Sequence, residues 1–257
     1  MQTGAITQYF DVAQITLYGF WIFLAGLIFH IRREDKREGF PLVSDLPGRV
    51  PLQEGALMPK PKVFLLQNGT TVLAPRFEPP APEPKALPIA RFPGAPLEPT
   101  GDPMIDGVGP ASWAQRSDLP DVMWDTGAPR IVPLRVVPGL HVASEDPNPV
   151  GMEVIGCDKL VAGIVRDVWV DQSEMVFRFL EVEVTAAAGM RHVLVPMTMV
   201  VFRKRHITVR SITSFQFANV PAIRNPEHIT RLEEDKIYGY FAGGTLYATA
   251  MRQEPLL

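Results

Sequence analysis

The sequence predicts a single transmembrane α-helix followed by a mainly-β domain with a C-terminal helix. Three observations support this fold class: an uncharged apolar run over residues 12–31, β-rich alternating runs over residues 163–184, and a helix start signal at Thr230. An apolar run of about 20 residues is typical of a membrane span. Alternation is typical of half-buried strands, and a capping motif indicates a helix N-terminus.

The run over residues 12–31 has the length of one span, because about 20 residues at about 1.5 Å each cross about 30 Å of hydrocarbon. A cleaved signal peptide is a poor alternative, since residues 1–11 hold no Lys or Arg. A buried core helix is also a poor alternative, since it would show a polar face. The polar residues here are only the scattered Gln14, Thr16 and His30.

The charges that flank the span predict its orientation. Basic residues near a span favour the cytoplasmic side of the membrane. They follow this span directly, at Arg32, Arg33, Lys36 and Arg37. We therefore expect residues 1–11 outside the cytoplasm and residues 32–257 inside it.

Residues 32–105 are predicted to be extended and irregular, because 14 of the 26 prolines lie between residues 41 and 100. Proline lacks an N–H donor and interrupts helices and central strands. One hairpin is expected, from Val63–Leu66 and Thr71–Leu73 around the Asn-Gly pair at 68–69. The apolar side chains of this segment favour packing on a partner surface over a free linker, which would be more polar.

Residues 106–257 are predicted to form a cytoplasmic globular domain. Two alternating runs, Gly163–Asp171 and Val176–Val184, are separated by a four-residue turn at 172–175. Further strands are expected at His192–Val195, Val200–Arg203 and Ile207–Ile212. Short strands joined by tight turns predict a small antiparallel barrel or sandwich.

A C-terminal helix is predicted from Thr230 to about Tyr247. Thr230 and Glu233 have the spacing of a capping box, in which each side chain accepts from a free backbone amide. The glycine pair at 243–244 is expected to weaken this helix.

Composition excludes several functions. A net charge of −3 argues against nucleic-acid binding, and the single Cys157 excludes an internal disulfide, in agreement with a reducing cytoplasm. The five histidines show no ligand spacing, so no metal site is expected. No nucleophile–base set is found either, which predicts a protein without its own active site.

One acidic constellation remains. Asp171 and Glu174 flank the predicted turn, and Asp167, Glu181 and Glu183 lie on the adjoining strands. The simpler interpretation is a solvated acidic hairpin. The alternative is a carboxylate relay, in which repulsion between neighbouring acids raises some pKa values toward neutrality, where protons can be taken up and passed on.

Four motifs together resemble the H subunit of the purple bacterial photosynthetic reaction centre, in order and in spacing. They are FWIFLAGLI at 20–28, RREDKREGFPL at 32–42, PTGDPMIDGVGPASW at 99–113 and LEEDKIYGYFAGGTLYA at 232–248. The resemblance therefore covers nearly the whole chain.

This resemblance implies a periplasmic N-terminus, a PRC-barrel in the cytoplasm, and a place in the bacterial inner (intracytoplasmic or chromatophore) membrane. The implied partners are the L and M subunits, which carry bacteriochlorophyll, bacteriopheophytin, quinones and non-haem iron, together with membrane lipids. The chain itself binds no cofactor alone. A light-harvesting ring and a cytochrome subunit are left open. The implied role is to stabilise the L/M core and its quinone region and to assist proton transfer to the secondary quinone.

By resemblance, Asp171 and Glu174 are proton-transfer residues and Arg178 tunes the electrostatics near the quinone. Some family members place two histidines in the loop after the ASW motif, where protons enter, but this chain has none there. Asp121 and Asp125 lie in the same loop, but the resemblance does not assign proton entry to them. The alternative function is a membrane-anchored adaptor or assembly factor, for which the carboxylates are plain surface.

Overall fold

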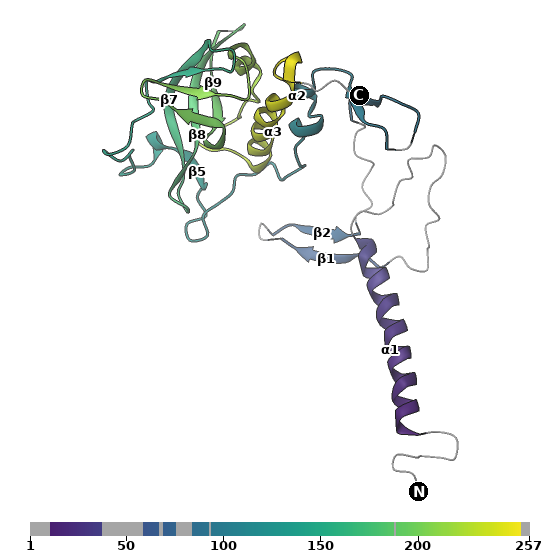
Figure 1. Cartoon of the computed structure of the whole chain (residues 1–257). Coiled ribbons are helices and arrows are strands. Elements are labelled where there is room, and N and C mark those ends of the chain that lie inside the picture. The colour runs from purple at the N-terminus through teal and green to yellow at the C-terminus, as the bar shows by residue number, and fades with distance from the viewer. Residues whose placement is uncertain are drawn as a thin grey trace. The chain divides into compact units, whose positions relative to one another are not determined.

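The computed structural model describes residues 11–37, 59–66, 69–75, 84–92, 94–187 and 189–252 (Figure 1). Their contacts define two compact units. The first contains the described residues of 1–82 and 91–95, and the second those of 83–90 and 96–257. The Pro-rich segment is thus divided between the units, and the expected boundary after residue 105 falls inside a short helix, α2 (Pro103–Asp106).

The first unit contains the predicted apolar helix, α1 (Val12–Glu34). Asp11 caps it by accepting a hydrogen bond from the Gln14 amide at 2.7 Å. The 23 residues of α1 reach roughly 34 Å at about 1.5 Å each. Among the described residues, α1 with the turn after it is the one helix long and apolar enough to cross a membrane. Its side chains are unburied within the chain, with Ile22 75% exposed.

The predicted hairpin is confirmed as β1 (Lys62–Leu65) and β2 (Thr71–Ala74), which pair antiparallel. Its turn is partly outside the described residues, because positions 67–68 are not described. Arg37, in the 3-10 turn after α1, donates hydrogen bonds to the carbonyls of Lys60 at 2.9 Å and Ala74 at 2.8 Å. These bonds tie the base of the hairpin to the end of the helix.

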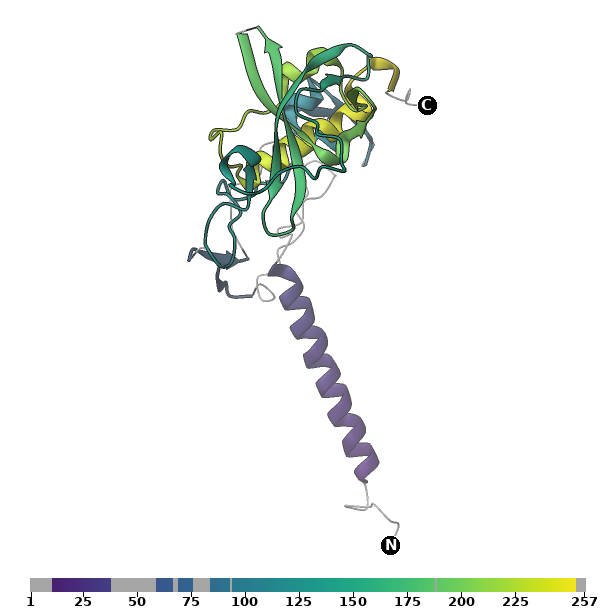
Figure 2. The same cartoon turned by 90° about the vertical axis from the view of Figure 1, so that its left-hand side faces the viewer.

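The second unit is built on a curled seven-stranded sheet, a half-barrel seen in Figure 2. Its strand order is β10-β11-β6-β7-β8-β9, with β5 paired to β7. The bounds are β5 Ile131–Pro133, β6 Glu153–Ile155, β7 Val161–Asp171, β8 Val176–Ala186, β9 Gly189–Pro196, β10 Val200–Phe202 and β11 His206–Val209. The mainly-β prediction is confirmed, except that β6 and β11 pair in parallel.

The second unit also contains smaller elements. A separate hairpin is formed by β3 (Ala86–Pro88) and β4 (Leu97–Pro99). Short 3-10 turns lie at Gly109–Ala111, Leu134–Val136, Met197–Met199, Ser214–Asn219 and Ala250–Arg252.

Two bulges curl the long β7–β8 ribbon. Arg166 is left out of the register on β7, and Arg178 is left out on β8. A bulge bends its strand and increases the local twist. The predicted alternation therefore holds for Leu180, Val182 and Val184, which are buried, but it is interrupted toward the start of β8 by the bulge at Arg178.

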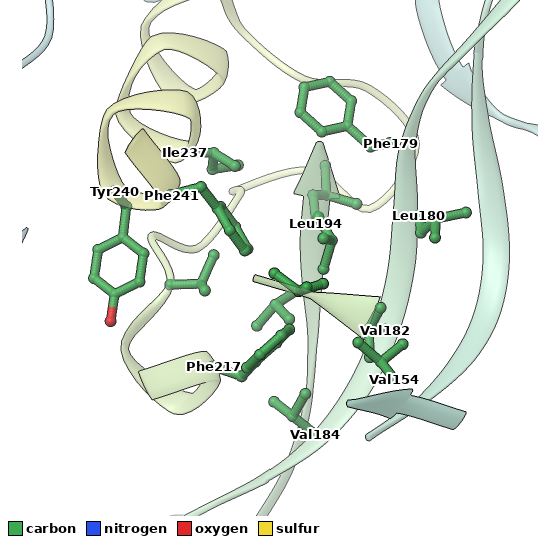
Figure 3. Packing of buried hydrophobic residues seen from close by; sticks show 14 of the residues in the cluster. Val154, Phe179, Leu180, Val182, Val184, Leu194, Phe217, Ile237, Tyr240 and Phe241 are labelled. Atoms are coloured by element: carbon green, nitrogen blue, oxygen red, sulfur yellow. The ribbon is translucent and has the colours of Figure 1, made fainter. Parts of the chain in front are cut away.

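The core lies between the sheet and α3 (Arg231–Tyr247), as Figure 3 shows. Ile237 and Phe241 from α3 point toward the sheet, and Phe217 packs against Phe241 with ring centroids 6.1 Å apart. Leu180 and Val182 from β8 belong to the same buried cluster. Each of these side chains is 0% exposed, and burying one contributes about 1.5–3 kcal/mol.

The C-terminal helix begins as predicted, and its glycines are close-packing positions. Both hydrogen bonds of the Thr230–Glu233 capping box are present. The helix continues through its glycine pair, which corrects the expectation of a weak point there. A Cβ on Gly243 would lie 2.5 Å from that of Ala111, and one on Gly244 would lie 2.6 Å from the Ser211 carbonyl oxygen. Only glycine allows these segments to approach so closely.

Candidate functional site

Asp171 ends β7 and shapes the turn to β8. Its Oδ1 atom accepts hydrogen bonds from the amides of Ser173 at 3.0 Å and Glu174 at 3.1 Å, and its carbonyl accepts one from the Met175 amide at 2.8 Å. Aspartate stabilises turns in this way. Met175 closes the turn with a φ of 54° in the left-handed region, and β8 then returns antiparallel to β7.

Arg130 lies directly before β5 and reaches this turn through strand register, because β5 places Ile131 opposite Asp171. Its Nε donates to Asp171 Oδ1 at 2.8 Å, and its Nη2 donates to Glu174 Oε1. Asp121 Oδ2 lies 3.5 Å from Nη1 of the same guanidinium. We call Asp121, Arg130, Asp171 and Glu174 the turn cluster.

The turn cluster keeps its buried acid ionised. Asp171 is 1% exposed, and burial by itself would raise the pKa of its carboxyl group. The hydrogen bonds from Arg130 and from the amides of Ser173 and Glu174 outweigh burial, so the pKa of Asp171 lies below its ordinary value. The hydrogen bond to Asp171 in turn raises the pKa of Arg130. The expectation of a pKa raised by repulsion is wrong for Asp171, because a guanidinium lies between the two carboxylates.

The two predicted proton-transfer residues are brought together, and they differ in access to solvent. The Glu174 side chain is 55% exposed, whereas that of Asp171 is 2% exposed. One guanidinium joins them. The cluster therefore connects a surface carboxylate to a buried one through the Arg130 guanidinium.

Arg178 is not in this hydrogen-bond cluster. Its guanidinium donates to Glu234 of α3 at 2.9 Å, and its Nε is buried with no hydrogen-bond partner in the described part of the chain. Burial would lower the pKa of Arg178, but Glu234, together with Tyr238 and Asp171, raises it overall. Arg178 thus remains a fixed positive charge at the bulge of β8.

The loop that lacks histidines contributes one acid to the site. Asp121 is shared between Arg130 and Arg231. Burial would raise the pKa of Asp121, but the hydrogen bond from Arg231 lowers it overall. Asp125 accepts a hydrogen bond from the Thr126 amide at 2.8 Å and takes part in the local turn.

A second cluster surrounds Glu181, an acid of the predicted constellation whose partners the sequence did not indicate. Its carboxylate pairs with Arg135 Nη1 at 2.6 Å, Trp169 Nε1 at 2.8 Å and His192 Nδ1 at 2.5 Å. Burial would raise the pKa of Glu181, but Arg135 and then His192 lower it overall. A cavity of about 730 Å³ lies beside this cluster. Asp167 joins it through Arg135 at 2.9 Å.

The remaining acid of the predicted constellation, Glu183, pairs with Arg166 at 2.7 Å. Within the described ranges, no group of three or more His, Cys, Asp or Glu side chains is arranged to hold a metal ion. Asp171, Glu174, Glu181 and Glu183 each pair with an arginine.

These features define a class: a single-pass membrane subunit that carries a small β-barrel domain. Residues 141–216, which contain β6 to β11, match the PRC-barrel domain. Residues 4–136 match the photosynthetic reaction centre, H-chain N-terminal region, and this match covers just over half of the 257 residues. The chain belongs to the photosynthetic reaction centre H-chain family, and the resemblance found in the sequence is confirmed.

Membership of this family establishes the general role of the chain. The chain is a structural subunit of a reaction-centre complex that contains other subunits, and it is not a classical enzyme. Its apolar helix makes it a single-pass membrane protein.

Two of the buried acids predict a pH dependence of stability. Asp171 and Glu181 have folded-state pKa values below their ordinary ones, so their ionisation favours the folded state above the unfolded pKa of about 4. This stabilisation is lost as the pH falls through the folded-state pKa. We expect the free energy of unfolding to decrease below about pH 4, and less steeply in Asp171→Asn. Urea unfolding followed by circular dichroism at several pH values tests this, and a constant free energy contradicts it.

Proposed function

We propose that this chain covers the cytoplasmic face of the L and M subunits, stabilises their quinone region and assists proton transfer to the secondary quinone. The observation that carries the proposal is the H-chain match over residues 4–136, joined to a PRC-barrel over residues 141–216. The quinones, pigments and iron belong to the partner subunits in this proposal.

Proton delivery is assigned to Glu174 and Asp171. Glu174 takes a proton from solvent, and Asp171 holds it transiently before it moves on toward the quinone. Because the lowered pKa of Asp171 favours the ionised form at neutral pH, its protonated form is short-lived in this proposal. Arg130 keeps both carboxylates within reach of one guanidinium.

Arg178 is proposed to tune the potential near the quinone. Its charge is anchored by Glu234, so its position does not depend on the protonation of the relay acids. A fixed positive charge near a site where negative charge develops stabilises that charge.

The span is proposed to place its N-terminus in the periplasm and to lie in the bacterial inner membrane. The basic residues Arg32 and Arg33 in the last turn of α1 support this orientation. The small residues Gly19, Ala25 and Gly26 are proposed to pack on neighbouring helices, where small side chains allow close approach. A Cβ built on Gly19 or Gly26 meets nothing within 4 Å in the isolated chain, so space is free there.

The alternative function, a membrane-anchored adaptor or assembly factor, is distinguished by pigment content. We expect the chain, tagged and purified gently from its membrane, to carry stoichiometric bacteriochlorophyll, because a stable subunit stays with the L and M core. A near-infrared absorption spectrum measures this. A chain that purifies without pigment favours the adaptor.

A further inference from the structure

The outer face of β11 lines a pocket of about 450 Å³ beside β6. His206, Thr208 and Arg210 alternate onto this face, whereas Ile207 and Val209 are 0% exposed on the opposite face. Thr208 pairs with Ile155 of β6, which also lines the pocket. The strand pattern thus presents two polar groups and a guanidinium on the same side of the sheet.

The pocket is bordered by cations from three further parts of the chain. Lys159 comes from the turn before β7 and has a φ of 64°. Arg252 comes from the C-terminal 3-10 turn, and its guanidinium is held by the carbonyls of Ser211 at 2.7 Å and Gly244 at 2.6 Å. The turn that leads into His206 adds the exposed Arg203, Lys204 and Arg205.

These cations lack acidic partners. Within the described part of the chain, Lys159, Arg210 and the three basic residues of the 203–205 turn form no ion pair. Two acids are close in sequence or register, but neither lines the pocket. Asp158 is bound to Ser214 Oγ at 2.7 Å, and Glu153 is the register partner of His206 on β6. Among the described residues, no acidic side chain lines this pocket or pairs with Lys159 or Arg210.

A second, smaller hollow of about 290 Å³ shares Arg210 and Arg252 with the first. It is lined by apolar Met199 and Val200 and by Ser211, which is 4% exposed. The Ser211 hydroxyl is buried and has no hydrogen-bond partner among the residues that the structure describes. A buried hydroxyl without a partner costs about 1–3 kcal/mol unless something binds it, so it points to a ligand with a hydrogen-bonding oxygen.

We propose that this basic pocket binds a phosphate group, supplied either by free phosphate or by the headgroup of an anionic phospholipid. Arg210, Lys159 and His206 contact the phosphate oxygens, and Arg252 closes the site between the two hollows. Guanidinium and ammonium groups are the usual partners of phosphate, because their hydrogen bonds to it are charge-assisted. This inference does not depend on the proposed proton relay.

The test uses the full chain in a neutral detergent, titrated with inorganic phosphate at constant ionic strength in a calorimeter. We expect saturable binding that Arg210→Gln weakens by about tenfold, the loss typical of one charge-assisted hydrogen bond. Lys159→Gln, on an exposed turn, is the second variant. Arg91→Gln is the matched control, because Arg91 is exposed and lies outside the pocket.

Short-chain phosphatidylglycerol and phosphatidylcholine distinguish the two sources. Tighter binding of the glycerol lipid than of phosphate, with none of the choline lipid, assigns a lipid headgroup. Equal or exclusive binding of phosphate assigns the free ion, and either result supports the site. Binding that chloride reproduces, or that Arg91→Gln weakens as much as Arg210→Gln, overturns it. Absence of saturable binding also overturns it and leaves the cations to contacts with an acidic protein.

Discussion

In a complex assembled with Glu174→Gln, we expect the proton-coupled transfer of the second electron to the quinone to slow by about tenfold or more. The amide keeps the size of the side chain and a hydrogen-bonding oxygen but cannot carry a proton. Primary charge separation should be unchanged, because it requires no proton from this chain. Flash-induced absorption spectroscopy measures both steps in the same sample.

Asp171→Asn is expected to slow the same step, because the buried Asp171 carboxylate and Glu174 both pair with the Arg130 guanidinium. Glu145→Gln is the matched control: it removes an exposed acid that lies in a loop outside the turn cluster. If Glu174→Gln and Glu145→Gln give the same rate as the unmodified chain, the proton-transfer role of Glu174 is wrong. The family assignment would stand, since it rests on the sequence matches.

The variant Arg130→Met is expected to lower the free energy of unfolding by about 3 kcal/mol. The loss is large because Asp171, 1% exposed, would keep its charge in a buried position without a cation. It stays at the low end of the range for broken buried pairs, since two backbone amides still bind the carboxylate. Urea unfolding of the full chain in a neutral detergent measures the change.

Two controls separate this effect from the loss of any arginine. Arg166→Met breaks a pair with Glu183 in which the arginine side chain is 48% exposed, so it should lower the free energy of unfolding much less than Arg130→Met does. The double variant Arg130→Met with Asp171→Asn should recover part of the stability, because no buried charge remains. Equal losses in Arg130→Met and Arg166→Met would contradict the account.

Local sequence signals predicted the elements whose structure depends on near neighbours. The hairpin at Val63–Leu66 and the capping box at Thr230 could be predicted, because the residues that form each of them lie within a few positions of each other in the sequence. The turn between Asp171 and Glu174 could be predicted for the same reason, since Asp171 accepts hydrogen bonds from amides only two and three residues away.

The partners of the acids could not be predicted, because they depend on strand register. Arg130 is 41 residues from Asp171 and meets it only once β5 pairs with β7. Arg135 is 46 residues from Glu181. Because the sequence does not show that these arginines lie beside the acids, the acids were interpreted as a group of repelling charges. This explains the wrong expectation about the pKa of Asp171.

Tertiary packing likewise decided the role of the glycines in α3. Helix propensity alone makes Gly243 and Gly244 a weak point. The segment containing Ala111 and the segment containing Ser211 lie so close to them that a Cβ would overlap both. The glycines are visible in the sequence, but the segments that pack against them, at Ala111 and Ser211, are known only from the structure.

The most direct test of the central claim is to remove this chain from the assembled complex and to add it back. Secondary quinone occupancy and flash-induced transfer of the second electron are measured before removal, after removal and after reconstitution. We predict that removal lowers both and that the unmodified chain restores both, while reconstitution with Glu174→Gln restores quinone occupancy alone. Occupancy and second-electron transfer that are unchanged by removal would contradict the claim that this chain stabilises the quinone region and delivers protons to it.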